Sequence, residues 1–267
     1  MRFSVLASGS TGNALYIETD EVRLLVDAGL SGRQLEQLLA EHRIGPNQLD
    51  AILISHEHID HVKGVGVLAR RYQLPVYANS GTWRAMPAQV GEIPEGQCRV
   101  FETGRWFRIG DLEIESFPTS HDAAEPVGFC FYHGEAKLGL ATDLGYVSRK
   151  VMEKVRDSHI LILEANHDVE MLRMSRYPWE VKRRILSDTG HLSNESAGDT
   201  LLEILKMGSA IRQVFLAHLS QENNLQELAH LTVEHCLRRE QIEVGKELTL
   251  AATFPDRPTP LKSVSGS

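Results

Sequence analysis

Four residues that commonly bind metals lie within the short segment LISHEHIDHVKG, residues 53–64. They are His56, His58, Asp60 and His61. Histidine occurs only 12 times in the 267 residues, and at such a frequency chance would produce this H-x-H-x-D-H pattern in about one sequence in a thousand of this length. Imidazole nitrogens and carboxylate oxygens are typical ligands of zinc, manganese, iron or cobalt. The segment therefore predicts a metal site.

The local direction of the chain predicts two metal ions rather than one. An extended chain that leaves a strand would present His56 and His58 on the same side, because side chains alternate with a period of two. A helix expected to begin near Val62 would turn Asp60 and His61 toward a different side. Two pairs that point in different directions indicate two ions a few ångströms apart.

Two ions need more ligands than these four residues supply. Three further candidates follow apolar, strand-like runs by one residue, as His56 does: they are His121, Asp143 and His218. Clefts form beyond the carboxyl ends of strands, so side chains in this position tend to meet. We therefore expect these three residues to complete the site.

The elements that must position these residues are short strands and amphipathic helices. Apolar runs bounded by turns predict strands near the start of the chain, at residues 3–6, 14–18, 22–26 and 49–55. Ser31 and the spacing of the leucines that follow it predict a helix over 31–45, and another helix is expected over 62–73. Residues 99–142 form a block rich in predicted strands, after which helices and strands alternate.

This order predicts two β-sheets packed face to face with helices outside, an αββα sandwich. No linker, repeat or low-complexity segment interrupts residues 1–255, so we expect one domain there. Residues 256–267, rich in proline and small polar residues, are expected to form a loosely ordered tail.

Charge and cysteine content restrict the setting of the protein. The formal net charge of −8 disfavours a nucleic-acid partner on its own, but two divalent ions would add about +4 at the site. The cysteines are scattered and odd in number, which indicates a reducing compartment; they are Cys98, Cys130 and Cys236. No apolar run suits a signal peptide or a membrane span. We expect a soluble, cytoplasmic protein without a membrane partner and of undetermined oligomeric state.

Several motifs together resemble a known family. The H-x-H-x-D-H segment, with TSHD (119–122), ATDLG (141–145) and LAHLS (216–220), resembles the metallo-β-lactamase superfamily over essentially the whole chain. LASGSTGNALYIE, LEANHDVEML and DTGHLSNESA are similar to its YycJ/WalJ branch and, more distantly, to RNase Z. The resemblance implies the αββα fold and a metal-dependent nuclease with 5′-to-3′ exonuclease action on double-stranded DNA.

The resemblance also implies the part that each ligand plays. It divides the ligands of two divalent ions (zinc, manganese or iron) as follows: His56, His58 and His121 at one ion, Asp60, His61 and His218 at the other, and Asp143 at both. A bridging water would become the nucleophile, with Asp60 orienting it or taking its proton. His191 would protonate the leaving oxygen, and Glu164 would hold the tautomer of His191.

Three segments are candidates for contact with the substrate. The glycine-rich loop of residues 8–13 could cradle a phosphate through Ser8, Ser10 and Asn13, although many such loops are only turns. His167 is expected to line the cleft. A basic stretch just before His191 carries aromatic residues as well, which suits phosphate contact and base stacking but also a solvated helix face. Its basic residues are Arg173, Arg176, Lys182, Arg183 and Arg184.

Other functions stay open at this point. Hydrolases of small esters, thioesters or lactones share the H-x-H-x-D-H centre, and an RNA-processing nuclease is a further alternative. The His191–Glu164 pair and the basic stretch favour a nucleic acid, because an acyl substrate would not require them. A non-catalytic regulator that binds metal would not need an open site for two ions.

Overall fold

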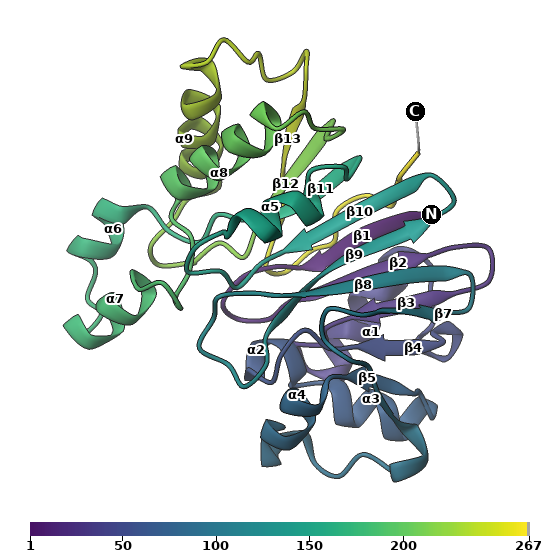
Figure 1. Cartoon of the computed structure of the whole chain (residues 1–267). Helices are drawn as coiled ribbons and strands as arrows, with labels where there is room; N and C mark the ends of the chain where they lie inside the picture. Colours follow the sequence, from purple (N-terminus) through teal and green to yellow (C-terminus); the bar gives the residue numbers. More distant parts are fainter. Residues whose placement is uncertain (266–267) are drawn as a thin grey trace.

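The structure, a computed structural model, describes residues 1–265. Two mixed β-sheets of seven strands each pack face to face, and helices cover their outer faces (Figure 1). This arrangement confirms the predicted αββα sandwich.

The first sheet contains the N-terminal strands and one strand from the C-terminal end of the chain. These strands are β1 (Arg2–Ala7), β2 (Ala14–Glu18), β3 (Arg23–Val26), β4 (Ala51–Leu53), β5 (Val76–Ala78), β6 (Cys98–Val100) and β14 (Lys262–Ser263). Their order is β14-β1-β2-β3-β4-β5-β6. Neighbours are antiparallel from β14 to β3 and parallel from β3 to β6.

The second sheet repeats this plan with the later strands. They are β7 (Trp106–Ile109), β8 (Leu112–Pro118), β9 (Val127–His133), β10 (Ala136–Ala141), β11 (Ile160–Glu164), β12 (Gln213–Ala217) and β13 (Thr249–Ala252). Their order is β13-β12-β11-β10-β9-β8-β7. An antiparallel meander from β7 to β10 is followed by parallel pairing from β10 to β13.

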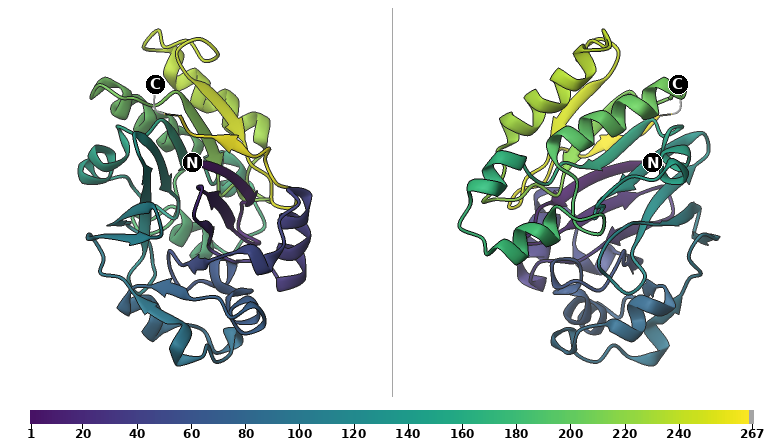
Figure 2. Two further views of the ribbon diagram at one scale, coloured as in Figure 1. Left: turned by 90° about the vertical axis from the view of Figure 1, so that its right-hand side faces the viewer. Right: turned by 60° about the vertical axis from the view of Figure 1, so that its left-hand side comes forward.

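Helices lie on both outer faces of the sandwich (Figure 2). They are α1 (Gly32–Glu41), α2 (Ile59–Val62), α3 (Val65–Tyr72), α4 (Ser80–Ala85), α5 (Arg149–Val155), α6 (Val169–Met174), α7 (Trp179–Ile185), α8 (Asn194–Lys206) and α9 (Gln226–Arg238). Three 3₁₀ turns lie at Pro46–Gln48, Ala88–Val90 and Glu95–Gln97. Of these, α1 and α3 bury apolar residues against the first sheet, while α5, α8 and α9 do so against the second.

The core between the sheets is aromatic and aliphatic. Phe3, Phe129 and Phe131 are fully buried there, and the Phe3 ring meets Phe215 edge-on at 5.3 Å. Because apolar burial is the main driving force for folding, this layer and the two helix–sheet layers hold the loops at the strand ends in place.

Two helices differ from their predicted bounds. Ser31 caps α1 as expected, in a capping box with Gln34, but the helix ends at Glu41 because Arg43 takes a left-handed φ of 61°. The helix predicted from Val62 is two helices, and the first begins at Ile59. They are separated at Gly64, where a Cβ atom would lie 2.4 Å from the carbonyl oxygen of Leu30.

The C-terminal segment also differs from the prediction of a loosely ordered tail. Lys262 in β14 pairs with Phe3 in β1, Thr259 donates its N–H to the Val5 carbonyl at 2.9 Å, and Val264 is buried between the sheets. The prediction is therefore wrong for residues 259–264, which are held against the first sheet. Residues 266–267 lie outside the described part of the chain.

Candidate metal centre

The predicted metal ligands meet at one end of the sandwich. The loops after β4, β8, β10 and β12 carry His56, His121, Asp143 and His218, respectively. The strands β8, β10 and β12 run in the same direction in the second sheet, so their carboxyl ends lie at one end of it (Figure 1). The loop after β4 in the first sheet joins them there, since Ser55 O accepts the N–H of Val127 at 3.2 Å. Side chains that directly follow the strand-like runs of the sequence are thus brought together in the structure.

The short helix α2 places the other three candidate ligands of the histidine segment. His58 is its N-cap, and Asp60 and His61 lie in its single turn. The carbonyl oxygens of Asp60 and His61 accept hydrogen bonds from Asn13 N and Ala28 N, at 2.8 and 2.7 Å. These bonds fix the turn against the loops after β1 and β3, so the helix begins earlier than the sequence predicts.

The side chains form two groups, each compact enough to hold a cation. One group is His56, His58 and His121; the other is Asp60, His61 and His218. Within each group the potential ligand atoms lie within 4.8 Å of one another. Two further groups of candidate ligand atoms overlap with these, one of His56, His61 and Asp143 and one of Asp143, Glu164, His191 and His218.

Asp143 lies between the two groups. Its Oδ1 is 3.4 Å from His218 Nε2 and 3.8 Å from His121 Nε2, and its Oδ2 is 3.5 Å from His61 Nε2. A single carboxylate thus reaches nitrogens of both groups, which is the geometry that a bridging ligand requires.

The donor atoms at the centre fit a divalent cation. His56 Nε2, His218 Nε2 and Asp143 Oδ2 are buried, and none has a hydrogen-bond partner within residues 1–265. Buried polar atoms are normally paired because an unmade hydrogen bond is costly. Cations bound by the two groups would satisfy these three atoms.

Electrostatics at the centre also favour positive charge. Burial would raise the pKa of Asp143, but His218 and His61 outweigh burial and hold that pKa well below its usual range. Burial opposes a proton on His218, yet the carboxylates of Asp143, Asp60 and Glu164 raise the pKa of His218 to about 10. The buried carboxylates therefore stabilise protons where no metal is bound, and a cation would replace them.

The backbone is strained at three points of the centre. Asp143, His218 and Asp27 all adopt left-handed conformations, with φ of 59°, 57° and 58°. Residues other than glycine seldom adopt this region, and such conformations concentrate at functional sites, where the surrounding structure maintains them.

Sequence reasoning missed Asp27, which supports one of the ligands. Its Oδ2 lies 2.8 Å from His61 Nδ1, and its carboxylate accepts hydrogen bonds from the N–H and hydroxyl of Ser55, both at 2.8 Å. Asp27 follows the apolar run of β3 by one residue. The rule that selected Asp143 would therefore have selected it too.

Replacing Asp27 by asparagine is expected to weaken metal binding by about 10- to 100-fold, as is usual when a ligand's hydrogen-bond partner is changed. The side-chain amide of asparagine lacks the negative charge with which Asp27 favours a proton on Nδ1 of His61. Titration of metal-free protein with zinc or manganese measures the effect. Asp111→Asn is a matched control, since Asp111 contacts His133 at 3.0 Å outside the centre. Equal affinity of Asp27→Asn and wild type would contradict the supporting role.

Glu164 holds two histidines at the rim of the centre. Its Oε1 lies 2.7 Å from His191 Nδ1 and 3.1 Å from His218 Nδ1, and its Oε2 accepts the N–H groups of Leu144 and Leu192. Although Glu164 is fully buried, its two histidine neighbours lower its pKa to about 2. An ionised carboxylate therefore contacts both His191 and His218, and the contact with His218 is one that the sequence did not indicate.

His191 stands beside the candidate ligands. Its ring centroid is 4.9 Å from that of His121 and 5.1 Å from that of His218, and its side chain is 18% exposed. Since Glu164 occupies Nδ1, the other ring nitrogen of His191 is the one that can serve a substrate.

The glycine-rich loop lies against the centre, and its residues differ in accessibility. Asn13 Nδ2 is 3.1 Å from His61 Nε2 and 3.4 Å from Asp60 Oδ2, while Ser10 is exposed. Ser8 is buried, and its hydroxyl accepts the N–H of His218 at 2.7 Å. Ser8 therefore holds the backbone at His218.

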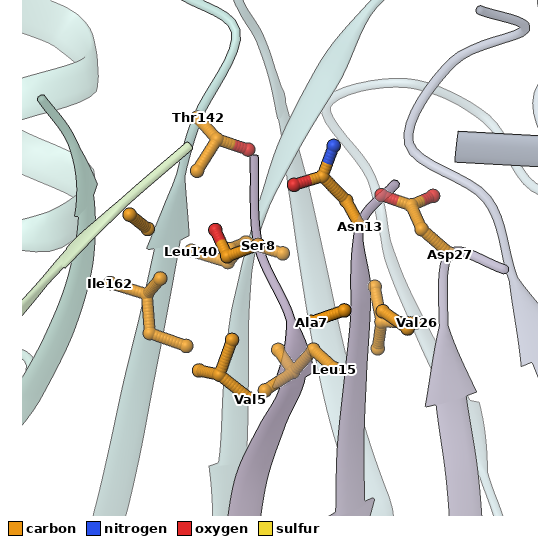
Figure 3. A pocket seen from close by; sticks show the side chains of 12 residues that line it. Val5, Ala7, Ser8, Asn13, Leu15, Val26, Asp27, Leu140, Thr142 and Ile162 are labelled. Carbon is orange, nitrogen blue, oxygen red and sulfur yellow. The ribbon is translucent and has the colours of Figure 1, made fainter. Parts of the chain in front are cut away.

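A small cavity of about 20 Å³ lies beneath this loop, between the sheets. Figure 3 shows polar ends of Ser8, Asn13, Asp27 and Thr142 at one side and apolar side chains below them. Such a volume holds about one water molecule. This cavity is therefore too small for a nucleotide.

His167 does not line an open cleft in this structure, contrary to the prediction. It is 1% exposed, and burial lowers its pKa to about 4, so the ring is neutral near pH 7. It lies next to the His191 segment, because the backbone at His167 bridges to Ser193.

The basic stretch folds into α6 and α7, and its side chains differ in what they contact. Lys182 is buried and donates to the carbonyl oxygens of Arg173 and Ser175, at 2.6 and 2.7 Å, so it joins the two helices. Arg173 is exposed beside Glu170, and Arg176 is exposed as well. The stretch is therefore partly structural and partly an accessible basic surface.

Comparison with known proteins agrees with this geometry. A family model described as a beta-lactamase superfamily domain matches residues 22–238. The chain therefore belongs to the β-lactamase superfamily, the class that the sandwich and its histidine-rich end indicate.

Relatives of similar length specify the branch. The chain is 48% identical over 264 residues to exodeoxyribonuclease YycJ of Bacillus anthracis, with 99% of each chain covered. It is 46% identical over 265 residues to exodeoxyribonuclease WalJ of Streptococcus pneumoniae, with 98% of each covered. Human tRNase Z, short form, has the same fold, with a TM-score of 0.64 and 16% identity over the whole of both chains. The predicted membership of the YycJ/WalJ branch is confirmed.

Proposed function

We propose that this protein is a metal-dependent nuclease that hydrolyses phosphodiester bonds of double-stranded DNA from the 5′ end. The observation that carries the proposal is the convergence of seven candidate ligands beside the His191–Glu164 pair. The exodeoxyribonuclease names of relatives that match nearly the whole chain support DNA as the substrate.

The centre would hold two divalent ions, zinc, manganese or iron. His56, His58 and His121 would bind one, Asp60, His61 and His218 the other, and Asp143 both. When bound, such ions supply Lewis acidity for an attacking water and neutralise charge on phosphate oxygens. Asp60 is the more accessible of the two carboxylates, at 21% side-chain exposure against 4% for Asp143. Its carboxylate would therefore orient the attacking water.

The His191–Glu164 pair would supply the proton for the leaving oxygen. Glu164 Oε1 lies 2.7 Å from His191 Nδ1, so the carboxylate would keep Nδ1–H in this hydrogen bond and leave Nε2 to carry the proton that is transferred. The proton on Nε2 can then pass to the leaving oxygen as its bond to phosphorus breaks.

Contacts with the DNA would come from polar and basic side chains around the centre, of which Asn13 is buried and the others are exposed. We propose that Ser10 and Asn13 contact the strand from the loop after β1, and that Arg173 and Arg176 contact phosphates from α6 and the segment after it. Trp179, which begins α7 and is 62% exposed, is suited to base stacking. Ser8 and His167 would support neighbouring residues from within the protein.

The setting is also a proposal. Within residues 1–265 no helix is long and apolar enough to cross a membrane. The three cysteines are free, which suits the reducing environment of the cytoplasm, and we place the protein there.

Incubation with end-labelled substrates tests the function. Purified protein with Mn²⁺ is expected to release the 5′ label of a duplex at once as a short product, while a 3′-labelled duplex shortens gradually. EDTA should abolish both reactions, and added metal should restore them.

Parallel reactions with single-stranded DNA, RNA and a thioester panel distinguish the alternatives. Faster turnover of RNA would favour an RNA-processing nuclease, and turnover of thioesters alone would favour a small-molecule hydrolase. Metal binding without turnover of any substrate would favour a regulator and would contradict the proposed activity.

A further inference from the structure

Arg184 is the residue of α7 that reaches the rim of the metal centre. Its Nε and Nη2 both donate to the carboxylate of Asp122, with Nη2 3.0 Å from Oδ1. The same Oδ1 lies 3.5 Å from Nε2 of His121, a candidate ligand. Only one carboxylate therefore separates the guanidinium from the metal centre.

The backbone around this pair is held firmly by tertiary hydrogen bonds. Ser120 Oγ donates to Asp188 O at 2.6 Å, and Asp122 N donates to Thr189 O at 3.1 Å. His121 Nδ1 lies 3.0 Å from Gly190 O. The loop that carries Asp122 and the loop that follows α7 are thus joined at several points, and Arg184 is placed by a rigid frame.

The pairing leaves one edge of the guanidinium available. Arginine has five N–H donors in a planar fork, and Asp122 occupies the Nε/Nη2 edge. The Nη1/Nη2 edge is the one that matches two oxygens of a phosphate. The side chain is 57% exposed, so a ligand can reach it, and its fixed orientation lowers the entropy lost on binding.

Arg184 differs in this respect from the other basic residues near it. The ammonium group of Lys182 donates hydrogen bonds to two backbone carbonyl oxygens. Arg173 forms an ion pair with Glu170, which lies on the same helix. Among these three, only Arg184 is oriented by a carboxylate from another loop, and that carboxylate lies 3.5 Å from a candidate ligand.

We propose that Arg184 binds a second phosphate of the DNA strand whose scissile phosphate lies at the metal centre, and that Asp122 orients Arg184 for this contact. This inference rests on the proposed nuclease function. The second phosphate is either a 5′-terminal phosphate or an internal one next to the scissile bond. Because it is not the reacting group, Arg184 determines specificity and affinity rather than the chemical step.

The test compares wild type, Arg184→Ala and Arg184→Lys on duplexes that carry a 5′-phosphate or a 5′-hydroxyl. Arg184→Ala is expected to raise KM by at least tenfold with kcat changed less than threefold, and to weaken equilibrium binding of the duplex, in Ca²⁺ without turnover, by a similar factor. Arg184→Lys should recover only part of this loss, because lysine keeps the charge but not the fork. A loss confined to the 5′-phosphorylated duplex identifies the terminal phosphate, and an equal loss on both identifies an internal one.

Arg238→Ala is the matched control. Arg238 pairs with Glu234 at 2.6 Å on α9, and its loss should leave KM and binding unchanged. Unchanged KM and binding in Arg184→Ala would overturn the inference. So would a joint fall of kcat, metal content and Tm, because the pair would then only fasten the two loops. If wild type binds the duplexes but does not cut them, only the proposed function is overturned. The difference in duplex affinity between wild type and Arg184→Ala still measures the contribution of Arg184 to binding.

Discussion

The His191→Ala variant is expected to lose about 10²- to 10⁴-fold in kcat on DNA, the usual contribution of a positioned general acid. Its metal content and Tm should stay at the wild-type values, since His191 is partly exposed and is not among the seven predicted ligands. Steady-state kinetics with labelled duplex, together with elemental analysis of the purified variant, measure both quantities.

The leaving group provides a sharper readout of the same prediction. A deoxynucleoside oxygen needs a proton as it leaves, whereas p-nitrophenolate leaves readily without one. If His191 is the proton donor, His191→Ala should lose far less activity on a p-nitrophenyl phosphodiester than on DNA. Equal losses on the two substrates would contradict a role in proton transfer.

His230→Ala is the matched control for this variant, because His230 is a partly exposed histidine near a glutamate on α9, and its removal should change neither quantity. The outcome for metal content is also informative. His191 lies in a group with Asp143, Glu164 and His218 whose potential ligand atoms are within 4.8 Å of one another. Loss of metal from His191→Ala would show that His191 is a ligand and would contradict its role as a proton donor.

The sandwich and the convergence of the ligands were predictable because each depends on a local pattern with a general physical meaning. Apolar runs form buried strands, and strands of one direction end at one edge of a sheet. His121, Asp143 and His218 each follow such a run by one residue, so position along the strand was sufficient to bring them together.

Features that depend on contacts between distant segments could not be predicted in the same way. The pairing of β14 with β1 depends on two ends of the chain meeting, and composition alone suggested a loose tail. Lys182 and Arg184 are both basic residues of the same short stretch of sequence. In the structure Lys182 is buried and donates to backbone carbonyl oxygens, whereas Arg184 binds Asp122, more than 60 residues away. The early start of α2 depends on N–H donors from Asn13 and Ala28, which no local pattern shows.

The Asp143→Asn variant is expected to lose affinity for both metal ions. Removing one partner from a buried charged cluster costs about 3–5 kcal/mol, which corresponds to about 10²- to 10⁴-fold weaker binding. Asparagine keeps the size of the side chain but removes the charge that faces His61, His121 and His218. Nuclease activity should fall at least as far at limiting metal, and excess Mn²⁺ should restore part of it.

Metal titration and elemental analysis measure this loss, with Asp157→Asn as a control at an exposed aspartate. Loss of a single ion would mean that Asp143 serves one ion only, and full retention of both would contradict its role as a ligand. Taken with His191→Ala, this variant separates two contributions. One substitution should remove the metal ions and activity together, and the other should remove activity while the metal ions stay bound. Excess Mn²⁺ should therefore restore activity to Asp143→Asn and leave His191→Ala unchanged, because added metal cannot replace a proton donor.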